Sequence, residues 1–530
     1  MVDFDGRVTA YWPASIEMNQ IPSQFPASQR TSYQFPVYRW IGWLTVAGFA
    51  IGLTVMFFIA GMFGIPAPLG WAALVIMFTM GTLLLDRPRL LLGLMMFYFL
   101  MMPSNRFLGL VGLPLPGFID ELFFLPFIAV IVMNWIQRRQ LQEATIFPVV
   151  FCLIAALSWY VNGRPSVFTA IQVTLIMLKS YIIWYYCRLT CTFENEQQMS
   201  RWVWIYILYA FIQYPYNILW QQGLWPKFHP DRSGGVFGPD GTGSAHVVGY
   251  FCAFALLLLA GWWVSSRHRT RLRRQWLVGL IVLVITYNLI FMTDTKHGLL
   301  LFPIAALPFL FHPRFPARLR LNLLAMGFVF MLFTTIYFQM AGGQADVRRI
   351  LESVDDSPKG EMMYAVTTDF SHLVPYPLLG AGPGRVSSSQ AIAARTPLAR
   401  RYIIPHLDQQ RRLGYFGRSG SVMSASILGY PKSSLTVLMG EFGWLGALAF
   451  YLFFGWVVVK LWRKSTTLPL ESPASGYFMG LCCCMIFLAF TTVLMDTITI
   501  GALSFPLWIL IGRMWDMRDG EEHGSQEAAG

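Results

Sequence analysis

Charged side chains are scarce in this sequence of 530 residues. Asp, Glu, Lys and Arg together make up 12% of the chain, whereas hydrophobic residues make up 55%. So few charges exclude a water-soluble protein of this size. The apolar residues instead recur in runs of roughly 18 to 25 residues, with Trp and Tyr at many of their ends. We therefore expect an all-α, polytopic membrane protein.

Cysteine is also rare, and none falls in the long polar interval 343–432. The seven cysteines lie in or at the ends of apolar runs, without metal-ligand spacing. The sequence thus predicts no disulfide-stapled loop, no metal site and no cofactor. The net charge of +12 requires no nucleic acid, because basic loops beside a membrane account for it. The cysteines are Cys152, Cys187, Cys191, Cys252, Cys482, Cys483 and Cys484.

The apolar runs predict twelve to fourteen transmembrane helices. Two of them, 89–102 and 298–311, are short enough to be re-entrant or tilted. The predicted ranges are 41–62, 68–85, 89–102, 118–135, 147–161, 166–187, 203–220, 245–264, 276–292, 298–311, 321–342, 433–459, 476–494 and 497–512.

Lys and Arg gather in alternate short loops, which predicts the orientation. These basic loops and both termini, 1–40 and the acidic, disordered tail 513–530, are expected in the cytoplasm. The long loop 343–432 and the loop 221–244 then share the external face, which in a bacterium is the periplasm. The basic residues of the cytoplasmic set are Arg87, Arg89, Arg138, Arg139, Arg188, Arg267, Arg269, Arg271, Arg273, Arg274, Arg314, Arg318, Arg320, Lys460, Arg463 and Lys464.

The interval 343–432 is the one long polar stretch between predicted spans. Its first half, 343–379, holds six carboxylates against three bases, and its second half, 380–432, holds eight Lys or Arg against Asp408 alone. A loop of this length inside a compact domain is normally functional. Positive charge concentrated beside a bilayer predicts an anionic partner. We expect this large loop to be partly helical.

Two shorter external turns could bind an anion. In HPDRSGGVFGPDGTGS, residues 229–244, glycines let backbone N–H groups approach an anion, and Arg232 offers a planar guanidinium fork. An interfacial turn whose arginine contacts lipid headgroups is the alternative. The turn TDTKHG, residues 293–298, places Lys296 at membrane depth, where ionisable groups usually face a cavity or a partner. A local ion pair between Asp294 and Lys296 at the membrane interface would explain the position of Lys296 equally well.

Two further motifs mark the long loop and its end. PLLGAGPGR, residues 377–385, predicts a tight turn that holds Arg385 at a fixed point, although such a run is often only a structured turn. In YPKSSLTVLMGEFGWLG, residues 430–446, the chain re-enters the membrane after Lys432, and Glu441 lies about two turns into an apolar helix. A carboxylate there should face a wet or positively charged cavity, or accept bonds from a neighbouring helix.

Together, these four motifs resemble the O-antigen ligase family, which includes polymerases of O-antigen and exopolysaccharide repeat units. The resemblance lies in their order and covers residues 200–460. It implies a GT-C-like, metal-independent glycosyltransferase of the bacterial inner membrane. Such enzymes move a glycan from undecaprenyl pyrophosphate to an acceptor hydroxyl on the periplasmic side. The implied partners are that lipid-linked donor, a glycan, lipid or protein acceptor, the bilayer, and other polysaccharide assembly proteins.

The resemblance also implies roles for single residues. Arg232 matches the family's essential arginine, and Lys296 stands where the family has Arg. The family's His-Asn pair at the end of the long loop is replaced by the run 430–434. His406 or His372 could substitute in space, although a loop histidine is more often an ordinary surface residue. Because that pair is missing, we favour a polymerase or a divergent ligase-like enzyme.

The chemistry of the expected reaction predicts similar roles for these residues, independently of the resemblance to the family. A polyprenyl pyrophosphate is a good leaving group, so its departure needs fixed cations more than a strong acid. Arg232, Lys296 and Arg385 are the candidates for that stabilisation. We expect Lys432 to bind phosphate before it acts as a base, and Glu441 to position rather than to accept a proton.

Two other classes of function stay open. A transporter or flippase of lipid-linked saccharides would be expected to distribute charges through many spans and to show related halves, and neither is apparent in this sequence. A non-catalytic membrane scaffold of an envelope polysaccharide assembly would use the basic loop to bind anionic lipid or polymer.

Overall fold

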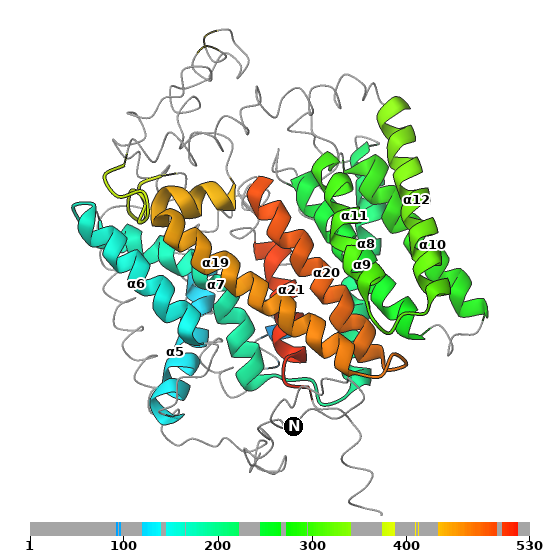
Figure 1. Cartoon of the computed structure of the whole chain (residues 1–530), viewed down its shortest axis with the longest axis horizontal. Helices are drawn as coiled ribbons and strands as arrows, with labels where there is room; N and C mark the ends of the chain where they lie inside the picture. Colours follow the sequence, from blue (N-terminus) through cyan, green and yellow to red (C-terminus); the bar gives the residue numbers. More distant parts are fainter. Residues whose placement is uncertain are drawn as a thin grey trace, which may run out of the picture. The chain divides into compact units, whose positions relative to one another are not determined.

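The computed structural model describes a helical bundle (Figure 1). Every element in the described residues is a helix, which confirms the all-α prediction for this part of the chain. The described residues are 89, 92–93, 95–96, 119–138, 145–164, 166–221, 244–266, 272–293, 295–340, 374–386, 409, 412, 433–494 and 501–517.

Each of the last eleven predicted spans coincides with a helix, because long apolar runs can satisfy their backbone polar groups inside a bilayer only in this way. The first three predicted spans lie largely outside the described residues. The helices are α5 (Ile119–Arg138), α6 (Ile146–Val161), α7 (Val167–Thr190), α8 (Glu196–Gln221), α9 (Ser244–Ser266), α10 (Leu272–Tyr287), the π-helix η4 (Asn288–Met292), α11 (Lys296–Phe311), α12 (Ala317–Met340), α19 (Ser434–Thr467), α20 (Pro473–Leu494) and α21 (Gly501–Met514).

Six stretches of helix are long and apolar enough to cross a membrane, namely 167–190, 246–265, 275–292, 317–336, 434–467 and 473–493. They indicate a membrane-embedded helical protein. α6, α11 and α21 are apolar but shorter. α8 is long, but the polar Gln213 and Asn217 lie in its apolar stretch. The predicted total of twelve to fourteen spans therefore remains a prediction.

α9 and α20 form the centre of the bundle. The apolar stretches of α9 and α20 are 83% and 78% buried inside the protein. The apolar stretch of α12 is only 12% buried, so most of its side chains are available to contact lipid. The two central helices run antiparallel and nearly touch, since a Cβ on Gly261 would lie 2.1 Å from the carbonyl oxygen of Gly476. Small residues at such crossings let membrane helices pack closely.

Three consecutive cysteines show how α20 is surrounded. The Cys482 thiol contacts the carbonyl of Val458 in α19 at 3.7 Å, and the Cys484 thiol contacts that of Phe254 in α9 at 3.6 Å. Cys483, between them, contacts the backbone of Phe309 in α11. Successive residues of a helix point about 100° apart, so α20 is packed on three sides.

α19 begins with a capping box and then bends. The Ser433 hydroxyl accepts the N–H of Thr436 at 3.1 Å, and the Thr436 hydroxyl accepts the N–H of Ser433 at 3.2 Å. Gly443 then leaves helical geometry, with φ of 68°. The predicted position of Glu441, about two turns into an apolar helix, is confirmed, and the structure adds a break directly after it, between two helical pieces. The later piece extends to Thr467, beyond the predicted end at 459.

The basic residues of several predicted cytoplasmic loops gather at one end of the bundle, here called the basic end. Arg188 pairs with Asp516 at 2.8 Å, Lys464 donates to the carbonyl of Trp515, and Arg314 donates to that of Leu468. This arrangement agrees with the predicted set of basic loops, while the side of the membrane on which they lie remains a prediction.

Candidate functional site

The loop motif at 377–385 docks on the broken part of α19, at the opposite end from the basic end. The break at Gly443 leaves backbone groups without helical partners, and the loop supplies them. Ala381 and Gly382 donate to the carbonyls of Gly440 and Glu441 at 2.8 and 3.2 Å. In return, Trp444 and Leu445 donate to the carbonyls of residues 377 and 378, at 3.4 and 3.1 Å.

Glu441 fixes the same loop with its side chain. Its Oε2 accepts the N–H of Gly384 at 2.6 Å, and its Oε1 accepts the N–H of Val386 at 3.2 Å. The carboxylate is fully buried, and bonds from backbone amides to a charged acceptor are among the stronger hydrogen bonds in proteins. The predicted positioning role fits this geometry, although the donors belong to a loop rather than to a neighbouring helix.

Two glycines permit this contact. Gly380 and Gly443 both have positive φ, 72° and 68°. A Cβ on Gly443 would lie 2.4 Å from the backbone of Gly380 and of Leu378, far inside contact distance. The two motifs therefore fit only because the residues that face each other have no side chain.

The end of α6 completes the junction. The Ser158 hydroxyl lies 2.5 Å from the carbonyl oxygen of Leu379 and 3.0 Å from that of Glu441. The Asn162 amide donates to the carbonyl of Gly380 at 3.0 Å. Arg385 reaches back to this turn, because its Nη1 donates to the carbonyl of Asn162 at 2.8 Å. We call the set Ser158, Asn162, Gly380, Arg385 and Glu441 the loop junction.

A second polar group lies inside the bundle where α8, α9, η4 and α11 meet. The side-chain Nδ2 of Asn217 donates to the side-chain Oδ1 of Asn288 at 2.5 Å. The hydroxyl of Thr295 donates to the hydroxyl oxygen of Thr293 at 2.9 Å. All four side chains are fully buried. We call Asn217, Asn288, Thr293 and Thr295 the amide–hydroxyl cluster.

Local backbone features place this cluster. The π-helix η4 begins at Asn288, and such wide turns occur frequently at functional sites. Gly249 of α9 lies against the hydroxyls, since a Cβ there would be 2.0 Å from Thr295 Oγ1 and 2.9 Å from Thr293 Oγ1. The cluster thus fixes the turn from which α11 begins at Lys296.

The cluster and the loop junction lie at the same end of the helices. The Tyr451 hydroxyl, in α19, bonds the Thr492 hydroxyl near the end of α20 at 2.8 Å. On another side of α20, Phe487 packs on Tyr250, one residue from Gly249 in α9, with ring centroids 5.5 Å apart. In Figure 1 the segment 374–386 lies beside α6 and α19, whereas α9 and α11 lie across α20.

The predicted site residues divide into three groups. Arg385 and Glu441 are brought together in the loop junction. Lys296 begins α11 beside the amide–hydroxyl cluster, so the helix that carries it differs from the elements that hold Arg385. The predicted convergence of these cations stays untested. Arg232, Lys432 and His406 lie outside the described residues.

Sequence reasoning missed the neutral members of both groups. Asn217 and Asn288 are amides within apolar spans, which is a signal for function or pairing inside a membrane. Ser158 and Asn162 carry no such signal, since a hydroxyl or amide near the end of a span is common. Their importance comes from the loop that reaches them across more than 200 residues of sequence.

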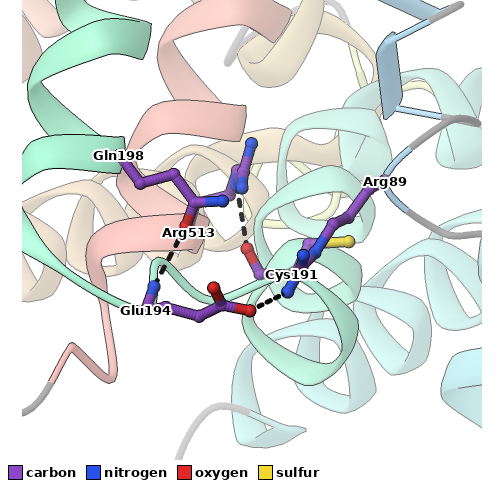
Figure 2. Close-up of polar contacts among 5 residues, drawn as sticks. All are labelled: Arg89, Cys191, Glu194, Gln198 and Arg513. Carbon is purple, nitrogen blue, oxygen red and sulfur yellow. Dashed lines mark hydrogen bonds and ion pairs between the residues drawn. The ribbon is translucent and has the colours of Figure 1, made fainter. Parts of the chain in front are cut away.

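The basic end holds a different polar cluster (Figure 2). Arg513 of α21 is 1% exposed, and its Nε donates to the carbonyl of Cys191 at 2.8 Å. Its guanidinium carbon lies 4.2 and 4.3 Å from the ring centroids of Phe193 and Trp202. Beside it, Arg89 pairs with Glu194. These contacts tie α21 to the connection between α7 and α8, which indicates a structural role.

Among the residues that the structure describes, no three His, Cys, Asp or Glu side chains are grouped so that they could hold a metal ion. Comparison with known proteins gives no family: no protein-family model and no curated protein matches this chain.

Proposed function

We propose that this chain is a membrane glycosyltransferase. It would transfer a glycan from an undecaprenyl-pyrophosphate carrier to an acceptor hydroxyl at the external, periplasmic face of the bacterial inner membrane, as an exopolysaccharide or O-antigen polymerase or ligase. The observation that carries the proposal is the amide–hydroxyl cluster. It lies where the predicted donor-binding elements join the helices: the segment with Arg232 ends at α9, and Lys296 begins α11.

The energetics of the cluster support a role beyond packing. Buried amides and hydroxyls are costly in an apolar bundle unless they are bonded to one another. Here their bonds hold one turn in a fixed shape. The turn makes residue 296 the first residue of a 16-residue helix, and the helix dipole gives a positive potential at that end. A diphosphate would be stabilised there as it leaves.

The proposed reaction needs no redox change. The acceptor oxygen forms a new bond to the anomeric carbon, while the bond between that carbon and the diphosphate oxygen breaks. The diphosphate keeps the electron pair, and the acceptor's proton leaves to a base or to water. Arg232 and Lys296 would stabilise the charge that develops on the diphosphate. Glu441 would not be the base, because both of its oxygens accept backbone N–H groups.

The decisive experiment replaces Arg232 by Lys, which keeps the charge but removes the planar fork. We expect glycan transfer to fall by roughly tenfold or more, with a normal amount of the protein in the membrane. Arg318→Lys is the matched control, because Arg318 is exposed near the start of α12, on the basic side. Normal transfer in Arg232→Lys would contradict the assigned role.

A second measurement separates the classes of function. A strain that lacks this chain should accumulate single lipid-linked repeats if the enzyme is a polymerase, or intact but unattached polymer if it is a ligase. Purified protein in liposomes that moves carrier lipid across the bilayer without extending or transferring glycan would identify a flippase instead. An unchanged glycan profile in the deletion strain would refute the proposal.

A further inference from the structure

The docked segment 374–386 lies against the ends of two helices that expose apolar side chains (Figure 1). The carbonyl oxygen of Leu378 accepts the backbone N–H of Leu445 in α19 at 3.1 Å. The carbonyl oxygen of the next residue, Leu379, lies 2.5 Å from the Ser158 hydroxyl of α6. These contacts place Leu378 beside the last turn of α6 and beside the first turn of α19 after its break.

From this point, α19 turns one apolar side away from the protein. Exposed apolar residues follow one another at helical intervals after the break at Gly443, at Leu445, Leu448, Leu452 and Val459. Residues at such intervals lie on one side of a helix. Because α19 is long and apolar enough to cross a membrane, this side faces the acyl chains of the lipids. α6 exposes a similar side, with Val149, Leu153, Leu157 and Tyr160.

The exposed part of the docked segment is apolar as well. It consists of Pro375, Tyr376 and Leu378. Leu378 is 60% exposed, which is as much as Leu448 on the lipid-facing side of α19, at 55%. The one charged residue of the segment, Arg385, is half-buried and donates to a backbone carbonyl of the α6 end. The segment therefore extends the apolar surface of the two helices and does not interrupt it with charge.

The start of α7 adds to this surface. A Cβ on Gly384 of the docked segment would lie 2.4 Å from Thr169 Cγ2, in the first turn of α7. Phe168, the residue before Thr169, is 77% exposed. An aromatic side chain that is this exposed contributes a large apolar area next to the segment.

Aromatic residues also mark the level of the segment. Tyr160 lies at the end of the apolar side of α6, Trp444 lies at the start of that of α19, and both are about half exposed, as is Tyr376 in the segment itself. Tyrosine and tryptophan concentrate where a membrane meets water, because each combines an apolar ring with a polar group. The three rings indicate that the docked segment lies at the level of the lipid headgroups.

We infer that the docked segment is inserted in the membrane surface, and that Tyr376 and Leu378 contact the lipids of the leaflet at the loop-junction end. The partner is a phospholipid bilayer, because the apolar surface of the segment is continuous with the lipid-facing sides of α6 and α19. The inference goes beyond the proposed function and does not depend on it. It places part of the interval 343–432 in the membrane surface, where the sequence predicts only an external loop.

The test measures what surrounds position 378 in the full-length protein. A nitroxide label is attached in Leu378→Cys, and the protein is placed in vesicles of phosphatidylethanolamine and phosphatidylglycerol. The background carries Cys152→Ala, because Cys152 is exposed and the other six cysteines are buried. Power-saturation spectra then compare collisions of the label with oxygen, which dissolves in the bilayer, and with a water-soluble nickel chelate.

We expect oxygen to relax the label at position 378 more than nickel does. Leu448→Cys is the lipid-facing control and should show the same preference more strongly, because it lies farther along the apolar side of α19. Glu471→Cys, which is exposed on the connection between α19 and α20, should show the opposite preference. Leu378 is largely exposed, so its replacement removes little packing.

Each other result overturns the inference. A preference for nickel at position 378 would mean that water covers the segment. Weak relaxation by both reagents would mean that protein covers it, either another part of the long loop or a second copy of this chain. Tyr376→Cys gives the same decision if Leu378→Cys does not fold. Because the spectra require no glycan transfer, loss of the proposed function would leave a positive result standing, and normal transfer would not rescue a negative one.

Discussion

The carboxylate of Glu441 accepts the backbone N–H of Gly384 at 2.6 Å, across 57 residues of sequence. The contact joins a membrane-embedded helix to a loop whose own side chains are mostly small. Because the donor is a backbone amide, the bond fixes the path of the loop and not merely one side chain. The position of Arg385, the next residue, depends on it.

Glu441→Gln should loosen this loop. The amide side chain can accept from one of the two backbone donors, but its NH₂ group then faces the other. Loss of a hydrogen bond to a charged acceptor costs roughly 1.5 to 3 kcal/mol, and we expect the apparent melting temperature in detergent to fall accordingly. Hydrogen exchange at Gly384 and Val386 should become faster. Glu471→Gln, at an exposed position, is the control, and equal exchange in both variants would argue against the assigned bonds.

Gly443→Ala should be more damaging. Alanine disfavours the positive φ of this residue, and its Cβ would lie 2.4 Å from the backbone of Leu378 and of Gly380. Backbone cannot move aside as a side chain can, so we expect a loss of about 3 kcal/mol or more in the free energy of unfolding. Gly455→Ala, in the same helix with no atom within 4 Å, should be neutral or stabilising by up to about 1 kcal/mol. Equal stability of the two variants would contradict this account.

The helices could be predicted from the sequence because a bilayer forces long apolar runs into helices. The break at Gly443 could not, since a glycine inside an apolar helix is common and its partner, Gly380, is distant in sequence. The docking of 377–385 on α19 consists largely of backbone bonds, which leave almost no trace in side-chain composition.

Of the candidate site, the sequence identified the positions of Arg385 and Glu441 but not that they share one junction. It also missed Asn217 and Asn288, because an amide in an apolar run signals pairing without naming its partner.

Arg513→Lys tests the cluster at the basic end. Lysine keeps the charge but loses the planar group that lies against the rings of Phe193 and Trp202, and it loses the Nε bond to the carbonyl of Cys191. We expect a loss of roughly 1 to 3 kcal/mol in stability. Glycan transfer per folded molecule should stay unchanged, because this cluster lies at the opposite end from the candidate site. Arg318→Lys serves as the exposed control, and a selective loss of transfer in Arg513→Lys would refute the structural role.

His312 should make the stability of the basic end depend on pH. The side chain is fully buried at the end of α11, with Nε2 3.4 Å from the Ser465 hydroxyl and Phe315 and Trp462 around the ring. Burial, together with the guanidinium groups of Arg314 and Arg320, lowers the pKa of His312 to about 4. The ordinary pKa of histidine is about 6.5. Between about pH 4 and pH 6.5, His312 is therefore protonated in the unfolded chain and neutral in the folded chain.

The sign of the effect follows from that difference. Above about pH 6.5 the histidine is neutral in both states, and its contribution to stability is fully present. As the pH falls from about 6.5 to about 4, the unfolded chain takes up the proton first, and up to about 3 kcal/mol is lost. Thermal unfolding in detergent at several pH values should therefore show a steeper acid decline in the wild type than in His312→Gln, which has no proton to gain. Parallel declines would mean that other groups, such as carboxylates, govern the acid sensitivity.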